Sequence, residues 1–190
     1  MTRIPLVEPQ DPTPEQARVY ATSPSGKLNI FRLLAHGRTV YPGFSLMTQA
    51  IFAQLSIPPA EREIVVLGVL HLDRGSYEWA QHVQIAQDMG IAREKVEAIA
   101  QDRFDDPVFD SREAALLAFT RQVVKTVRVD DRTFAAVAAF YDPQQIVETL
   151  FTIGVYMMIL RISEVAELEL DDVLGADVVR AATGAAVRPT

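Results

Sequence analysis

The chain has 190 residues and contains no cysteine. This absence excludes disulfide bonds, zinc sites built from thiolates and cysteine nucleophiles. Any catalysis by this chain therefore depends on other side chains.

Basic side chains are outnumbered by acidic ones, with 18 Lys and Arg against 25 Asp and Glu, so the formal net charge is −7. The isoelectric point is about 5.0. Such a chain repels a phosphate backbone on average, and no cluster of Lys and Arg interrupts the acidic balance. We therefore expect no nucleic-acid partner.

Long hydrophobic runs are also missing: no uninterrupted apolar run reaches the ~18 residues that a membrane-spanning helix needs. Hydrophobic residues still make up 49% of the chain. The mean hydropathy is +0.11, and we assign this apolar excess to a subunit interface. Residues 1–14 lack the apolar core of a signal peptide, so we expect a cytoplasmic protein without a membrane partner.

The hydrophobic residues show no alternating pattern with a period of two, which argues against a β-sheet. The sequence predicts an all-α fold in a single domain. We expect helices at about 13–21, 28–35, 41–55, 60–72, 77–89, 93–101, 111–128, 130–141 and 143–161. The acidic stretch 102–110 is expected to be a loop.

Boundary signals support several of these helices. Thr13-Pro14-Glu15-Gln16 resembles a capping box with proline in the first turn, and Asp142-Pro143-Gln144-Gln145 repeats this arrangement. Ser76 is a suitable N-cap for the helix at 77–89, and Gly90 is a suitable residue to end it.

The same pattern predicts three parts of the chain: an irregular arm with one short helix at 1–28, a helical domain at 29–165 and a tail at 166–190. Ile4, Leu6 and Val7 of the arm have little local structure against which to pack. We therefore expect the arm to wrap around a neighbouring subunit.

The most informative stretch is Ser76-Tyr77-Glu78-Trp79-Ala80-Gln81-His82. Glu78 and His82 lie four residues apart, so their side chains meet on one face of the expected helix. A carboxylate that orients an imidazole produces a general acid/base suited to neutral pH. The alternative is an ordinary ion pair beside a histidine whose hydrogen bonds are already satisfied.

Further candidate residues surround this pair. Glu63 precedes an apolar run, where it either caps the helix or turns inward to meet a partner. Arg161 ends the most apolar helix, which also carries Tyr156, and such an arginine caps carbonyls, pairs with an acid or binds substrate. A metal site made by Glu63, Glu78 and His82 is a competing hypothesis, although no Glu-x-x-His repeat supports it.

Three segments together resemble the carboxymuconolactone decarboxylase family, within the AhpD-like superfamily. They are Asn29-Ile30-Phe31-Arg32-Leu33-Leu34-Ala35-His36, Arg62-Glu63-Ile64-Val65-Val66-Leu67 and Tyr77-Glu78-Trp79-Ala80-Gln81-His82. Segments 115–119 and 156–161 are similar to the carboxy-terminal helices of that family. The resemblance spans roughly 29–161.

The resemblance implies an all-α AhpD-like bundle that forms a homo-oligomer with sites near subunit contacts. AhpD-type peroxidases have a glutamate, then Cys-x-x-Cys, then a histidine, and the first and last of these correspond to Glu63 and His82. The two cysteine positions fall on Gly75 and Glu78. Both thiols are absent, so AhpD-type peroxide reduction is excluded for this chain.

We therefore predict a lyase or isomerase that needs no cofactor and no metal, with decarboxylation as the reaction implied by the family. His82 is the predicted general acid/base, oriented by Glu78, with Glu63 as a second acid or relay. Tyr77, Trp79, Tyr156 and Arg161 are the predicted substrate-binding residues. The expected partners are a small carboxylate, lactone or carbonyl compound and further copies of the chain, as a dimer, trimer or hexamer. The rivals are a metal-dependent enzyme and a non-catalytic binding protein.

Overall fold

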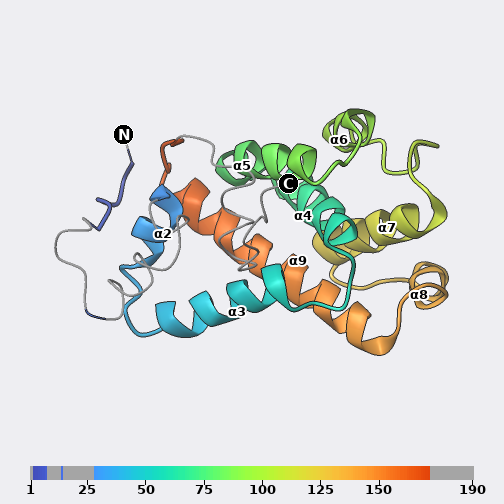
Figure 1. The fold of residues 1–190 in the computed structure, drawn as a ribbon, viewed down its shortest axis with the longest axis horizontal. Helices are drawn as coiled ribbons and strands as arrows, with labels where there is room; N and C mark the ends of the chain where they lie inside the picture. The colour runs from blue at the N-terminus through green and yellow to red at the C-terminus, as the bar shows by residue number, and fades with distance from the viewer. Residues whose placement is uncertain (1, 8–13, 15–27, 172–190) are drawn as a thin grey trace, which may run out of the picture.

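The computed structural model describes residues 2–7, 14 and 28–171. All regular secondary structure in these residues is helical, which confirms the predicted all-α class (Figure 1). The helix expected at 13–21 lies outside the described residues, apart from Pro14. The helices are α2 (Asn29–Leu34), α3 (Tyr41–Ala53), α4 (Pro59–Asp73), α5 (Ser76–Asp88), α6 (Arg93–Ala100), α7 (Ser111–Thr126), α8 (Asp131–Ala138) and α9 (Pro143–Val165).

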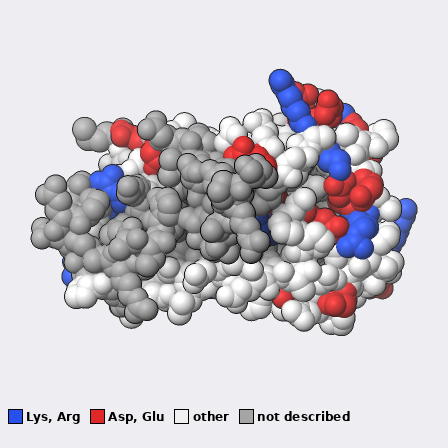
Figure 2. Space-filling model, in the orientation of Figure 1, with Lys and Arg blue, Asp and Glu red and all other residues white. Residues whose placement is uncertain are grey.

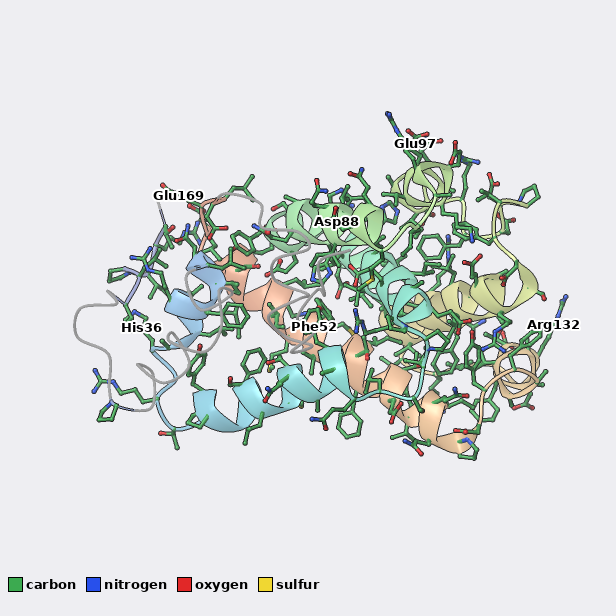
Figure 3. All side chains as sticks on the ribbon, viewed as in Figure 1. His36, Phe52, Asp88, Glu97, Arg132 and Glu169 are labelled. Atoms are coloured by element: carbon green, nitrogen blue, oxygen red, sulfur yellow. The ribbon has the colours of Figure 1, made fainter. Side chains whose placement is uncertain are left out.

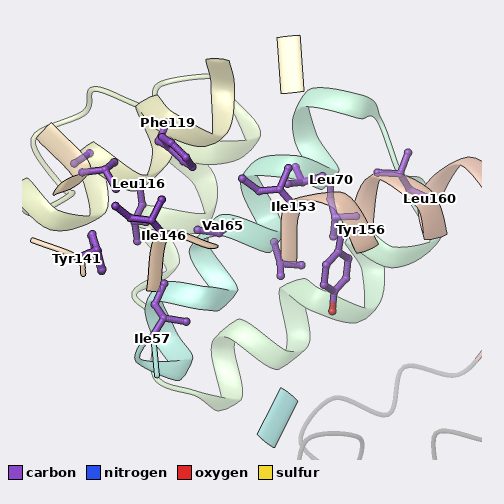
Figure 4. Packing of buried hydrophobic residues seen from close by; sticks show 14 residues of the cluster. Ile57, Val65, Leu70, Leu116, Phe119, Tyr141, Ile146, Ile153, Tyr156 and Leu160 are labelled. Carbon is purple, nitrogen blue, oxygen red and sulfur yellow. The ribbon is translucent and has the colours of Figure 1, made fainter. Parts of the chain in front are cut away.

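Helix α4 is the centre of the bundle and packs against α5, α7 and α9. Its sequence between positions 62 and 70 is buried on every side, as expected for a helix that is apolar nearly all round. Figure 4 shows Val65 and Leu70 of this helix among Phe119 of α7 and Ile153 and Tyr156 of α9. The only charged side chains in this buried stretch are those of Arg62 and Glu63.

Helix α9 is long and apolar enough to cross a membrane by length and composition, but half of its most apolar window is buried inside the protein. It is a core helix with one exposed face, and it is capped as predicted by Asp142 and Gln145. Its outer face lines an apolar groove with α3, formed by Met47, Val147, Leu150, Phe151, Gly154, Val155 and Met158.

The charged side chains lie mainly outside this apolar groove. On the described part of the face in Figure 2, acidic and basic groups intermingle at the end of the molecule that carries α6, α7 and α8.

The start of α5 differs from the prediction. Gly75, not Ser76, is the N-cap residue, and it makes no side-chain cap. The Ser76 backbone N–H and hydroxyl instead donate hydrogen bonds to the carboxylate of Glu164 in α9, at 2.7 and 2.5 Å. At the other end, Gly90 has a φ of 79°, which confirms its predicted role in ending the helix.

The described part of the amino-terminal arm, residues 2–7, lies along its own chain. The Arg3 N–H donates to the Ala166 carbonyl at 2.7 Å, and the Val7 N–H donates to the Arg32 carbonyl at 3.3 Å. Ile4 leaves 40% of its surface exposed. Contact between this arm and a neighbouring subunit therefore stays a prediction.

The turn between α4 and α5 approaches α9 so closely that Gly75 has no room for a side chain. A Cβ atom added there would lie 2.9 Å from Cβ of Leu160 and 3.2 Å from Cδ2 of Leu70. The nearer atom is fixed to the backbone of α9, so it cannot swing aside as the tip of a long side chain can. Gly43 in α3 has no such neighbour within 4 Å.

We predict that Gly75→Ala lowers the free energy of unfolding by about 1–3 kcal/mol, because the added methyl group forces α9 and the turn apart. The matched control Gly43→Ala should leave it unchanged or raise it by up to about 1 kcal/mol, since alanine favours a helix and meets no neighbour. Urea denaturation of both variants measures the difference. Equal effects at the two positions would contradict the packing argument.

Candidate active site

A cavity of about 70 Å³ lies between α2, α3, α5 and α9. Its volume accommodates several water molecules or the body of a small organic compound. The described residues that line it include no Lys or Arg, and most are apolar: Leu28, Ile30, Phe31, Leu34, Phe44, Thr48, Ile51, Phe52, Tyr77, Glu78, Gln81, His82, Ile85, Val155, Tyr156 and Ile159.

Helix α5 supplies the polar part of the cavity wall. Tyr77 and Gln81 lie one turn apart on one row of the helix, and Glu78 and His82 form the adjacent row. All four side chains are buried. The α5 face that the sequence singled out therefore borders the cavity.

The imidazole of His82 is held by Glu63 of α4, not by Glu78 as the helical spacing predicted. Nδ1 of His82 lies 2.5 Å from Oε1 of Glu63. A carboxylate can only accept a hydrogen bond, so Nδ1 carries the proton and donates it. Nε2 has no hydrogen-bond partner within the part of the chain that is described, and His82 borders the cavity. The prediction failed because the partner comes from a neighbouring helix, which i,i+4 spacing cannot reveal.

Arg62 extends this pair and was missed from the sequence. Its Nη2 lies 3.7 Å from Oε2 of Glu63, and its Nη1 donates to the carbonyl of Phe52 at 2.8 Å. Its guanidinium also lies over the Phe52 ring, 5.0 Å from the centroid. The signal for its role was an arginine beside the acid at the start of a buried run. The positive charge offsets part of the cost of burying the Glu63 carboxylate.

Two aromatic rings fix the imidazole in place. Phe52, labelled in Figure 3, stacks with His82 at 6.3 Å between centroids, and Tyr156 meets it edge-on at 4.9 Å. Burial, together with the negative charge of Glu63, raises the pKa of Tyr156 well above its ordinary value. The Tyr156 hydroxyl stays protonated at neutral pH, and it has no hydrogen-bond partner among the described residues.

Glu78 is buried and turns toward α9, away from the imidazole. Its Oε2 lies 3.0 Å from the hydroxyl of Ser163, while Oε1 is buried without a partner. Burial raises the pKa of Glu78. The Ser163 hydroxyl also lies 3.0 Å from the Leu160 carbonyl. Since a hydroxyl has one proton, Ser163 shares it between two acceptors, Oε2 of Glu78 and the Leu160 carbonyl.

Two of the predicted substrate-binding residues line the cavity, and two do not. Tyr77 and Tyr156 do. Trp79 faces a separate outer groove and lies near His71, at 6.4 Å between ring centroids. Arg161 is largely exposed and lies outside the cavity. Its Nη2 pairs with Asp73 at 2.7 Å, and its Nη1 donates to the carbonyl of Met157 at 2.5 Å. Trp79 and Arg161 thus lie on the faces of α5 and α9 that point away from the cavity.

The metal hypothesis finds no geometric support in the described residues, where no three His, Asp or Glu side chains converge as ligands. Glu63 meets His82, but the Glu78 carboxyl group turns toward Ser163.

Part of the chain matches a known protein family. Residues 39–122, which include Glu63, Glu78 and His82, match the model of the Carboxymuconolactone decarboxylase family. No curated protein sequence matches the chain significantly.

Several solved structures share the fold at low sequence identity. An uncharacterized peroxidase-related protein with an alkylhydroperoxidase AhpD core, from Ralstonia eutropha JMP134, is 16% identical with a TM-score of 0.78, covering 96% of each chain. A peroxidase-related protein from Silicibacter sp. TM1040 is 15% identical with a TM-score of 0.76, covering 90% of this chain and 92% of that one. The debrominase Bmp8 is 17% identical with a TM-score of 0.75, covering 94% of this chain and 95% of that one. These similarities establish an AhpD-like fold.

Glu78 generates a prediction about pH. Because burial raises its pKa above the ordinary 4.5, the folded protein binds a proton that the unfolded chain releases. Stability is therefore fully present below pH 4.5 and is lost as the pH rises through the folded-state pKa. We predict that Glu78→Gln, which keeps the shape and removes the charge, becomes increasingly more stable than wild type as the pH rises from 4.5. Urea denaturation across pH 4–8 measures this trend.

Glu148→Gln is a control for which the pH dependence of stability should have the opposite sign. Partial burial acts to raise the pKa of Glu148, but hydrogen bonds from Gln144 and Ser56 outweigh it and lower the pKa. Wild type should therefore lose its advantage over this variant as the pH falls through the acid range. A pH-independent difference for Glu78→Gln would show that Glu78 ionises in the folded protein as it does in the unfolded chain.

Proposed function

Because residues 39–122 match the model of the carboxymuconolactone decarboxylase family, we propose that this protein is an enzyme that transfers protons on a small molecule in the α5 cavity. The reaction is a cofactor-independent decarboxylation or isomerisation of a carboxylate, lactone or carbonyl compound. The observation that carries the proposal is the buried Glu63–His82 pair, whose imidazole borders the cavity. We place the catalytic domain at 29–165 and the protein in the cytoplasm.

His82 is the proposed general base. Its Nε2 accepts a proton from the substrate, while Glu63 holds Nδ1–H and stabilises the imidazolium ion that forms. The positive charge of Arg62, 3.7 Å from the far oxygen of Glu63, stabilises that carboxylate behind the imidazole. In this proposal Glu63 takes the orienting role that the sequence hypothesis gave to Glu78, because Glu63 is the carboxylate in contact with the imidazole.

Tyr156 and Glu78 are the proposed acids. When His82 removes a proton from the carbon next to a carbonyl, the electron pair moves onto the carbonyl oxygen. The Tyr156 hydroxyl donates a hydrogen bond to that oxygen, and the carboxyl group of Glu78, whose pKa burial raises, is the proposed proton donor to the product. Return of the proton at another carbon is isomerisation. In decarboxylation the carbon–carbon bond to the carboxylate breaks instead: carbon dioxide leaves, the bonding pair enters the carbonyl, and a proton is then added at that carbon.

The structural relatives support a small ring compound as a substrate type. One of them, a cysteine-to-alanine variant of the debrominase Bmp8, was determined in complex with 2,3,4-tribromopyrrole. The mostly apolar wall of the present cavity suits the apolar body of a small compound. A thiol reaction does not transfer to this chain, because it has no cysteine.

We also propose that the protein forms a homo-oligomer through the groove between α3 and α9. Val147, Leu150, Phe151 and Met158 expose between 41% and 58% of their surfaces there, and a contiguous apolar surface of this kind is typical of a protein interface. Whether the assembly is a dimer, trimer or hexamer is part of the measurement below.

The central test is hydrogen exchange at carbon, which reports proton transfer without knowledge of the final product. A panel of small carbonyl compounds, lactones and carboxylates is incubated with the enzyme in D₂O and followed by NMR. We predict deuterium incorporation or carbon dioxide release with at least one compound. His82→Gln should slow this by about 100- to 10,000-fold, because it removes the general base.

His71→Gln is the matched control, since His71 lies outside the cavity and pairs with Asp102. It should leave the rate unchanged. Equal rates for wild type and His82→Gln would refute the proposal. If both proteins are folded and neither shows exchange with any compound, the non-catalytic rival is favoured. Stoichiometric iron, zinc or manganese in protein purified without added metal would favour the metal-dependent rival.

A separate prediction concerns assembly. Phe151→Glu places a charge on the groove and should shift the protein to monomers in light scattering coupled to size-exclusion chromatography. Phe134→Glu is the control, because Phe134 is a comparably exposed phenylalanine on α8. A wild-type monomer, or an unchanged mass for Phe151→Glu, would contradict the interface proposal.

A further inference from the structure

The last described residue of the chain, Asp171, is bound as a carboxylate at the edge of the cavity. Its Oδ2 accepts a hydrogen bond from the Asn29 backbone N–H at 2.5 Å and from the Tyr77 hydroxyl at 3.0 Å. Its Oδ1 accepts from Nε2 of Gln81 at 3.0 Å. Figure 1 shows this part of the chain, in red, beside α2 near the carboxyl end of α9.

Two of these three donors belong to the cavity itself. Tyr77 and Gln81 line it and are 3% and 5% exposed, so the half-buried Asp171, which is not itself a lining residue, contacts two side chains of the cavity wall. Tyr77 is held in position by a further contact, because its oxygen lies 3.4 Å from the Ile30 N–H. The three donors, Asn29 N–H, the Tyr77 hydroxyl and the Gln81 amide, thus converge on one carboxylate.

The row formed by Tyr77 and Gln81 lies beside the row formed by Glu78 and His82 on the same two turns of α5. A carboxylate bound where Asp171 now lies is therefore adjacent to the acid/base groups. A compound bound there could keep its carboxylate on Tyr77 and Gln81 and extend its apolar body into the cavity. The reacting carbon would then be presented to His82 and Glu78.

We propose that Asn29 N–H, Tyr77 and Gln81 form the carboxylate-binding subsite of the cavity, which the chain's own Asp171 occupies in place of a substrate carboxylate. This inference rests on the proposed function, and it narrows the substrate class to small monocarboxylates with an apolar body. It adds a regulatory element, because the segment 167–171 must release the subsite before such a substrate binds. It also explains how a cavity lined by no Lys or Arg recognises an anion, since neutral donors hold the carboxylate.

The tethered carboxylate is a strong competitor for simple physical reasons. A group on a short segment of the same chain has an effective concentration in the millimolar range, so a free carboxylate must exceed that value or bind more tightly. Removing Asp171 removes this competition and leaves the three donors in place.

The test compares matched pairs of probes, isobutyrate with isobutyramide and cyclopentanecarboxylate with cyclopentanecarboxamide. Dissociation constants are measured by NMR titration for wild type, Asp171→Ala and the control Glu167→Gln. Glu167 pairs with Arg3 in the same segment, so its substitution removes the same charge away from the subsite. We expect Asp171→Ala to bind the carboxylates about tenfold more tightly than wild type and the amides equally well, with no gain for Glu167→Gln.

A double variant then locates the effect. Tyr77→Phe combined with Asp171→Ala should lose most of the gain for carboxylates, because it removes one donor and keeps the ring. Thermal denaturation verifies that each variant is folded, and Asp171→Asn replaces Asp171→Ala, with the same direction expected, if the alanine variant is not. Unchanged carboxylate affinity without Asp171, or an equal gain for amides, would overturn the proposal.

The binding measurement is independent of turnover, so the two proposals can fail separately. His82→Gln combined with Asp171→Ala should bind carboxylates as tightly as Asp171→Ala alone. A gain in carboxylate binding without any carbon–hydrogen exchange would retain the subsite and refute the acid/base function. Exchange activity that is lost with His82 but insensitive to Asp171 and Tyr77 would retain the function and refute the subsite.

Discussion

The hydrogen bond between Glu63 and His82 is the interaction on which the site depends, because it links the most buried helix of the bundle to the helix that borders the cavity. Glu63 is completely buried, and an isolated carboxylate there would be very costly. Arg62 on one side and the imidazole on the other make that charge tolerable. The same contacts fix the tautomer of His82, so structural stability and chemical orientation come from one arrangement.

The sequence predicted the helices well, because apolar periodicity and capping residues are local signals. Asp142 and Gln145 cap α9 as expected, and Gly90 ends α5 in a left-handed conformation. Of the three acid/base candidates, Glu63 and His82 are in contact, while Glu78 turns toward Ser163 of α9. Their pairing could not be predicted in the same way: Glu63 and His82 come from different helices, and side-chain contacts between helices depend on packing angles that no spacing encodes.

Under the proposed function, position 78 has a different chemistry from the AhpD-type pattern that the sequence resembles. That pattern has a cysteine here, whose reactivity depends on losing its proton. In this chain the carboxyl group of Glu78 is buried beside Ser163, and burial raises its pKa. A carboxyl group with a raised pKa can give or take a proton, but it cannot carry out thiol chemistry.

The crowding at Gly75 has a consequence for engineering a thiol pair into this chain. A cysteine at position 78 alone would have no second thiol with which to form a disulfide. A side chain at position 75 meets the Cβ of Leu160, so either the turn between α4 and α5 or α9 must shift to accept it. A Cys-x-x-Cys arrangement at positions 75 and 78 therefore needs a local rearrangement of the packing as well as two cysteines.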